Sequence, residues 1–87
     1  MNLFNKKTIL VTGGTGSFGN AFVKKIIKSK FKELRIFSRD EKKQNDMRLA
    51  LNDPRVKFYI GDVRDKDSVF QVLKGIDYVF HAAALKQ

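Results

Sequence analysis

Four short apolar runs alternate along the chain with three amphipathic segments. The runs cover residues 8–12, 34–38, 56–60 and 78–80, and the first lacks polar alternation, as expected for a strand buried on both faces of a parallel sheet. Between them, residues 18–29, 41–51 and about 65–73 carry apolar side chains spaced for one face of a helix. The pattern predicts an α/β chain with the order β-α-β-α-β-α-β.

Each predicted helix has an apolar inner face and residue types that favour its ends. The inner faces are predicted to hold Phe18, Phe22, Val23, Ile26 and Ile27 in the first helix, Met47, Ala50 and Leu51 in the second, and Val69, Phe70, Val72 and Leu73 in the third. Pro54 lies where the second helix must have stopped. Asp65 or Asp67 can cap the third helix, and Gly75 suits the left-handed position just past its end.

Short connections and right-handed crossovers wind these elements into a parallel sheet of strand order 3-2-1-4. That order is the N-terminal half of a Rossmann doubly wound sheet, which needs about two more strands. We therefore expect residues 1–87 to form a partial dinucleotide-binding domain truncated at Gln87, with the second half of the sheet and the substrate domain absent. The last strand should then expose an apolar edge.

A glycine-rich segment follows the first strand and opens the first helix. Gly13, Gly16 and Gly19 have the spacing G-x-x-G-x-x-G, in which glycines permit a tight turn, close approach of a pyrophosphate and close helix packing. Free N–H groups at the helix start attract the anion. The expected donors are the amides of Thr15, Gly16, Ser17 and Phe18. A glycine-rich turn without a ligand is the structural alternative.

The end of the second strand predicts which dinucleotide binds. The residues there are Ser38, Arg39, Asp40, Glu41, Lys42 and Lys43. Arg39 suits the 2′-phosphate of NADP, Ser38 can donate a hydrogen bond, and Lys42 or Lys43 adds positive potential. Asp40 is the counter-evidence, because it can be the acid that holds the ribose of NAD, placed two positions later than usual. The balance of these residues favours NADP, and a solvated charge run explains Lys42 and Lys43 equally well.

Two further segments follow the third and fourth strands. Asp62 can accept from an adenine amino group and Val63 can pack on the ring, although a capping or turn role for Asp62 fits the spacing equally well. Ala82 is small enough for the backbone to pass close to a cofactor, and Lys86 lies toward the mouth of the crevice. From the residues alone, His81 is a satisfied near-core histidine and Lys86 a surface lysine.

Composition narrows the possible partners. The chain has 18 Lys and Arg against 9 Asp and Glu, a formal charge of +9, no cysteine and one histidine. Disulfides and thiolate metal sites are excluded, and we predict no metal. The charge raises nucleic acid as a partner, but aromatic residues at core-facing positions argue against it. No run is long enough to span a bilayer and no signal peptide is present, so we predict a cytoplasmic protein.

Taken together, four segments resemble the extended short-chain dehydrogenases/reductases. The segments are residues 12–19, 38–44, 61–65 and 81–87, and the second and last are the more particular. They are similar to the polysaccharide-biosynthesis group of inverting UDP-N-acetylglucosamine 4,6-dehydratases. The resemblance implies a tightly held NADP that takes a hydride from C4 of the sugar and returns it at C6 as water leaves across C5 and C6, with epimerisation at C5.

The resemblance also implies the roles of individual residues. It assigns the pyrophosphate to Thr15–Phe18, the 2′-phosphate to Ser38–Lys43, the adenine to Asp62 and Val63, and the nicotinamide region to Ala82 and Lys86, with Lys86 also reaching the UDP-sugar. It further implies a homo-oligomer, commonly a hexamer, in bacterial capsule or surface-glycan synthesis.

The family's catalytic residues are not among these segments. The family's Tyr-x-x-x-Lys motif needs a lysine four residues after a tyrosine. Tyr59 is followed at that distance by Val63 and Tyr78 by Ala82, so the motif is expected downstream of Gln87. A UDP-sugar 4-epimerase of the same superfamily and a non-catalytic NADP-binding module remain the alternatives.

Overall fold

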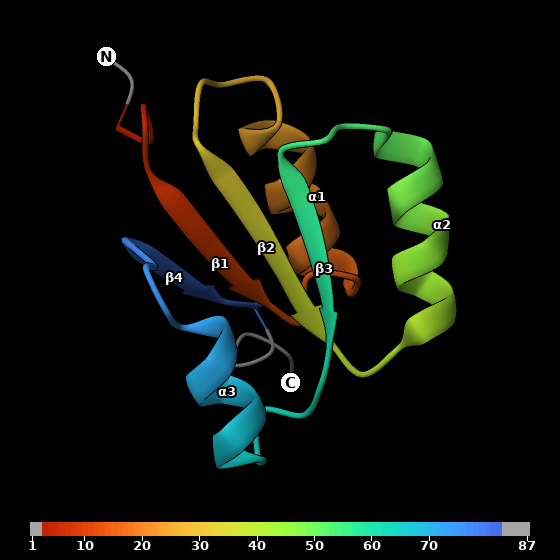
Figure 1. Cartoon of the computed structure of the whole chain (residues 1–87). Helices are drawn as coiled ribbons and strands as arrows, with labels where there is room; N and C mark the ends of the chain where they lie inside the picture. The colour runs from red at the N-terminus through yellow and green to blue at the C-terminus, as the bar shows by residue number, and fades with distance from the viewer. Residues whose placement is uncertain (1–2, 83–87) are drawn as a thin grey trace.

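The computed structural model describes residues 3–82 of the chain, and a parallel sheet forms its centre (Figure 1). Its strands are β1 (Thr8–Thr12), β2 (Glu33–Ser38), β3 (Val56–Ile60) and β4 (Tyr78–His81). The helices α1 (Ser17–Ile26), α2 (Glu41–Leu51) and α3 (Lys66–Val72) connect them. The strand order is β3-β2-β1-β4, which confirms the predicted Rossmann-like α/β topology.

All strand pairs are parallel, so the carboxyl ends of the strands gather at one edge. Thr12 at the end of β1 is paired with Phe37 on one side and His81 on the other. Ser38 at the end of β2 is in turn paired with Ile60. Every loop that leaves this edge therefore starts close to the others.

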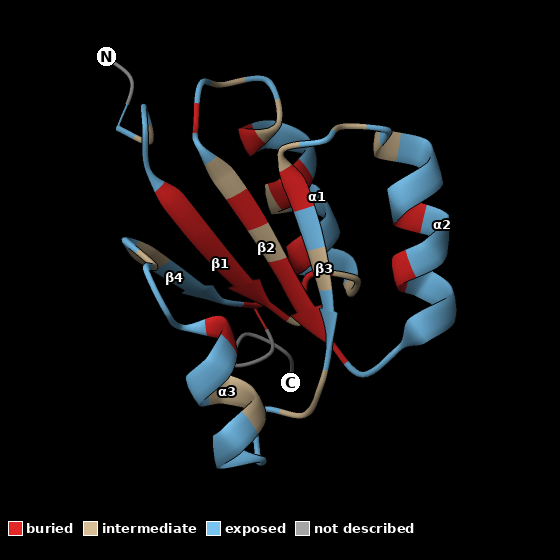
Figure 2. Cartoon of the chain, in the orientation of Figure 1, coloured by how far each residue is buried: buried red, intermediate tan, exposed pale blue. Residues whose placement is uncertain are grey.

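The helices form layers on both faces of the sheet (Figure 1): α1 and α2 cover one face and α3 the other. Strand alternation divides β2 between two cores. Leu34 and Ile36 belong to the larger core under α1 and α2, whereas Phe37 packs with Leu10 and Val72 under α3. All of β1 is buried, as Figure 2 shows, because it is central and covered on both faces.

The helix ends follow local sequence signals. The regular part of α1 ends at Ile26 instead of near Ser29, because the amides of Lys28 and Ser29 donate to carbonyls three residues back. Asn52 adopts a left-handed conformation with φ 46° at the end of α2. Asp65, rather than Asp67, caps α3. Gly75 has φ 74°, as predicted for the position beyond α3.

Several predicted inner-face residues lie on the surface. Phe18, Ala50, Phe70 and Leu73 are exposed, and Phe70 keeps 75% of its accessible surface. The helices contact the sheet along narrower stripes than the sequence suggests: Val23 and Ile26 in α1, Gln44 and Met47 in α2, and Val72 in α3. Three of the eight phenylalanines, Phe18, Phe70 and Phe80, are therefore exposed, contrary to the expectation that the aromatics face the core.

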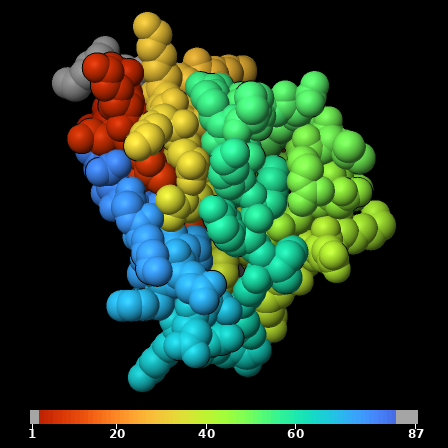
Figure 3. All heavy atoms as spheres, viewed as in Figure 1, coloured from red at the N-terminus to blue at the C-terminus, as the bar shows by residue number. Residues whose placement is uncertain are grey.

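The apolar edge predicted for the last strand is present within the described residues. Strand β4 pairs with β1, and Val79 and Phe80 are 50% and 40% exposed. On one side, the Phe80 ring contacts that of Phe22 from α1, with centroids 3.9 Å apart. On the α3 face, Figure 3 shows the atoms of β3 at the surface beside those of α3. The outer strands are thus less covered than β1 and β2.

Candidate functional site

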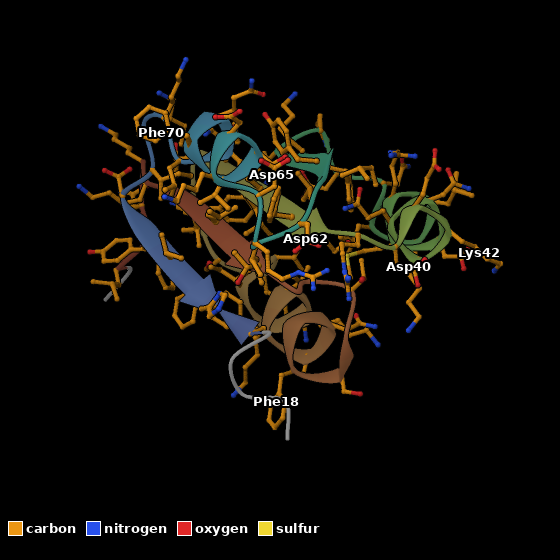
Figure 4. All side chains as sticks on the ribbon, turned by 90° about the horizontal axis from the view of Figure 1, so that it is seen from below. Phe18, Asp40, Lys42, Asp62, Asp65 and Phe70 are labelled. Carbon is orange, nitrogen blue, oxygen red and sulfur yellow. The ribbon has the colours of Figure 1, made fainter. Side chains whose placement is uncertain are left out.

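A cleft of about 1120 Å³ lies at the carboxyl edge of the sheet, the edge viewed in Figure 4. Most of the predicted site residues line it. They are Gly13, Thr15, Gly16, Ser17, Phe18, Gly19, Ser38, Arg39, Asp40, Glu41, Lys43, Asp62, Val63 and Ala82. Lys42 does not line the cleft, and Lys86 lies outside the described residues. Phe37, Gly61 and Arg64 line it without having been predicted.

The glycine-rich loop forms one wall of the cleft. Gly13 has φ 67°, and its amide donates to the Phe37 carbonyl at 2.8 Å, which joins the ends of β1 and β2. A Cβ at Gly19 would lie 2.4 Å from the Gly13 carbonyl oxygen, so the first turn of α1 is packed directly on the loop. This is the close helix packing predicted for the third glycine.

The start of α1 is open toward the cleft. Gly16 is the N-cap residue, no side chain caps the helix, and its first turn has no acidic residue. One expected donor is already used, because the Gly16 amide donates to the Gly13 carbonyl at 3.1 Å. A Cβ at Gly16 would be no closer than 3.5 Å to its nearest neighbour, and φ is −79°. Packing among the described residues therefore does not require glycine here.

The end of β2 and the start of α2 form the second wall. Asp40 caps α2, its Oδ1 accepting from the Lys43 amide at 2.9 Å. Lys42 is exposed on the outer side of α2, where its Nζ pairs with Asp46 at 3.2 Å (Figure 4). The helix turns this side chain away from the cleft, as the alternative of a solvated charge run allows. Arg39 and Lys43 are the basic side chains from this segment that line the cleft.

Asp62 links two arginines beside the cleft. It accepts from the backbone and guanidinium of Arg64, with Oδ2 2.8 Å from Nη2, and lies 3.6 Å from Nη1 of Arg39. Hydrogen bonds from Arg64 lower the pKa of Asp62 to about 2, and the charge of Arg39 contributes. Asp62 thus has the turn role that the sequence allowed. The sequence signal for Arg64 is its position two residues after Asp62, since an aspartate in a turn commonly accepts from the residue two positions later.

A buried amide lies behind this wall. Gln44 is 1% exposed, and its Nε2 contacts Ser38 and the Tyr59 carbonyl. In the sequence, Gln44 is the last residue of the segment 38–44 that resembles the dehydratases, and no binding role was predicted for it. The one local signal for its burial is helical spacing, which puts Gln44 three residues before Met47 on the same face, although its polar side chain argues against burial.

The residue that follows β4, Ala82, also lines the cleft. Ala82 is buried there. The Nδ1 atom of His81 contacts the hydroxyl of Thr12, so the ring has the hydrogen-bond partner that was predicted. His81 is exposed, however, whereas the sequence predicted a place near the core. Within residues 3–82, no group of metal-ligating side chains is present and no helix is long and apolar enough to cross a bilayer.

A parallel sheet of order 3-2-1-4 with a glycine-rich loop between its first strand and helix defines a Rossmann-type chain. A model of the family described as polysaccharide biosynthesis protein matches residues 9–87. The chain belongs to this family.

Known proteins share both sequence and fold with the chain. Proteins named UDP-glucose 4-epimerase from Rickettsia bellii and Rickettsia prowazekii are 63% and 61% identical over 98% of it. The chain spans about a quarter (26%) of their length. The structure of Pen from Bacillus thuringiensis has a TM-score of 0.84 and 36% identity, covering 88% of this chain and 24% of that one.

A more distant structure shares the fold alone. WbmF from Bordetella bronchiseptica, solved in complex with NAD+ and UDP, has a TM-score of 0.70 and 21% identity, covering 90% of this chain and 23% of that one.

Proposed function

We propose that this chain binds the adenosine and pyrophosphate part of NADP in an enzyme that modifies UDP-sugars. The observation that carries the proposal is the cleft itself, in which the glycine loop, the end of β2 and the end of β3 meet at the carboxyl edge. Ligands of open parallel sheets bind at this edge.

The residues of the cleft fit a dinucleotide. The uncapped start of α1 offers the amides of Ser17 and Phe18 to a pyrophosphate, and Gly16 leaves space beside them. A nicotinamide dinucleotide, when bound, supplies hydride transfer to and from a sugar carbon. Its adenine would lie against Val63, next to Asp62, which holds Arg64 in place.

The preference for NADP rests on charge at the end of β2. Arg39 is 71% exposed and its single 3.6 Å contact with Asp62 is weak, so its guanidinium is free to fork onto a 2′-phosphate. Lys43 adds a second positive charge at the same wall. Asp40 accepts from the Lys43 amide as the cap of α2, which leaves it less suited to hold a ribose.

The activity best supported for the whole protein is UDP-sugar 4-epimerisation, because relatives more than 60% identical carry that name. The 4,6-dehydratase is the second candidate, favoured by the resemblance of residues 38–44 and 81–87 to that group. The catalytic base, the UDP-sugar contact of Lys86 and an oligomeric assembly are part of this proposal.

A titration with NADPH and NADH tests cofactor choice. Arg39→Ala should weaken NADPH binding about tenfold or more and leave NADH binding within about twofold, since a charged hydrogen-bonding partner is lost. Lys42→Ala removes the same charge from the outer side of α2 and should change neither. Equal loss of both nucleotides in Arg39→Ala would contradict the NADP preference, and no binding by the wild type would contradict the proposal.

Mass spectrometry of the product separates the two activities. When the whole protein is incubated with UDP-glucose or UDP-N-acetylglucosamine and the products are first separated by chromatography, an epimerase gives a new peak of unchanged mass, whereas a dehydratase gives one that has lost water. An unchanged substrate with saturating cofactor would contradict both.

A further inference from the structure

The buried side chain of Gln44 contacts the part of the cleft where the 2′ substituent is proposed to bind. Its Nε2 lies 2.9 Å from the Ser38 hydroxyl, 2.8 Å from the Tyr59 carbonyl and 3.3 Å from the Ser38 carbonyl. The contacts connect α2 with the ends of β2 and β3. Gln44 itself does not line the cleft.

Two carbonyl oxygens fix the orientation of this amide. Carbonyls only accept hydrogen bonds, so the amide atom that faces them is the NH₂ group. In this orientation Gln44 Oε1 is buried without a partner among residues 3–82. The opposite orientation would place Oε1 against both carbonyl oxygens, which is worse because no proton would lie between them.

The orientation of Gln44 determines what Ser38 can do. An NH₂ group carries no acceptor, so in the 2.9 Å contact the Ser38 hydroxyl accepts. Its own proton then has no acceptor among residues 3–82, although Ser38 is only 9% exposed and lines the cleft. A donor that lines the cleft and has no protein acceptor is available to a ligand oxygen.

We infer that Gln44 is a positioning residue that fixes Ser38 as a hydrogen-bond donor to an oxygen of the cofactor's 2′-phosphate. A phosphate oxygen carries no proton at the contact and is the partner that such a donor lacks. The inference rests on the proposed function and adds a determinant of NADP preference that acts alongside the charge of Arg39.

A double-mutant cycle tests the inference in the intact protein. Ser38→Ala and Gln44→Met are each expected to lower NADPH affinity about tenfold and NADH affinity less than about twofold. The double variant should bind NADPH no more weakly than Ser38→Ala, because Gln44 acts through Ser38. Gln71→Met, the same substitution at an exposed position of α3, is the matched control and should change neither affinity.

The outcomes separate this inference from the proposed function. Wild type that binds neither nucleotide overturns both. Two results overturn the inference alone, provided that the wild type prefers NADPH. In the first, Gln44→Met lowers the affinities for NADPH and NADH equally. In the second, the losses of NADPH affinity caused by Ser38→Ala and Gln44→Met multiply in the double variant.

If Gln44→Met does not fold, two measurements still decide. Ser38→Ala must reduce the preference for NADPH, and a structure with NADP must place Ser38 Oγ within hydrogen-bond distance of both the 2′-phosphate and Gln44 Nε2. Failure of either overturns the inference.

Discussion

Two glycines at the junction of β1 and α1, Gly16 and Gly19, differ in why glycine is needed there. Gly19 is required by packing, because a Cβ added to it would lie 2.4–2.7 Å from backbone atoms of Gly13 and Gly14. Gly16 has an ordinary φ, and a Cβ added to it would lie 3.5 Å from the nearest atom, the Gly13 carbonyl oxygen. The two positions therefore separate the requirements of the fold from those of a ligand.

Substitution at these glycines should have opposite effects. Gly19→Ala should lower the free energy of unfolding by about 1–3 kcal/mol, because the new methyl would overlap backbone atoms that cannot move independently. Gly16→Ser should leave stability unchanged or slightly higher, since serine is a favoured N-cap, and should abolish NADPH binding. Denaturant unfolding and nucleotide titration measure both. Retained NADPH binding in folded Gly16→Ser would contradict the proposed pyrophosphate site.

The charge of Asp62 makes stability depend on pH. Its folded pKa of about 2 is below the unfolded value near 3.9, so its ionised form stabilises the fold above about pH 4. That contribution should be lost as the pH falls from about 4 to 2. Asp62→Asn should show a smaller loss of stability in this window, measured by thermal unfolding at several pH values. Arg64→Met should behave in the same way, and a loss identical to that of the wild type would contradict this role.

At the scale of elements, α3 depends on a side chain from the sheet. The helix is short, and Nη1 of Arg35 donates to the carbonyls of Val72 at 2.9 Å and Lys74 at 2.6 Å, while its Nε pairs with Glu33. These contacts hold the end of the helix against β2. Hydrophobic periodicity predicted the helix but not its dependence on Arg35, because the contact joins residues far apart in sequence.

Arg35→Leu should therefore destabilise the chain through α3. We expect a loss of about 1–3 kcal/mol, since charge-assisted hydrogen bonds to two carbonyls disappear. Hydrogen exchange should increase most at the end of α3. Arg39→Leu, which removes a mostly exposed arginine, should change stability by less than about 0.5 kcal/mol. Equal losses in the two variants would contradict the capping role.

At the scale of the whole molecule, β4 and α3 both carry exposed apolar side chains. Val79, Phe80 and Phe70 are exposed, and β4 is one of the two edge strands of the described sheet. An exposed apolar edge favours pairing with another strand. The larger core lies on the α1 and α2 side.

The 87-residue chain on its own should accordingly self-associate. Val79→Lys should reduce this association, because a charge on an edge strand opposes pairing. Sedimentation velocity over a range of concentrations measures the effect, and Lys57→Arg on the exposed part of β3 is a control that keeps its charge. A wild-type chain that stays monomeric at all concentrations would contradict the prediction.

The sequence by itself determined the order of elements, the strand order and the glycine loop, because these follow from periodicity, short connections and the few residues that tolerate tight turns. Only the tertiary structure decided which helix residues touch the sheet. Phe18 and Phe70 are apolar but exposed, and Gln44 is polar but buried. The tertiary structure also brought Arg64 to the cleft, turned Lys42 away and joined Gln44 to Ser38. Such contacts depend on how each helix is rotated and placed on the sheet, which residues distant in sequence determine together.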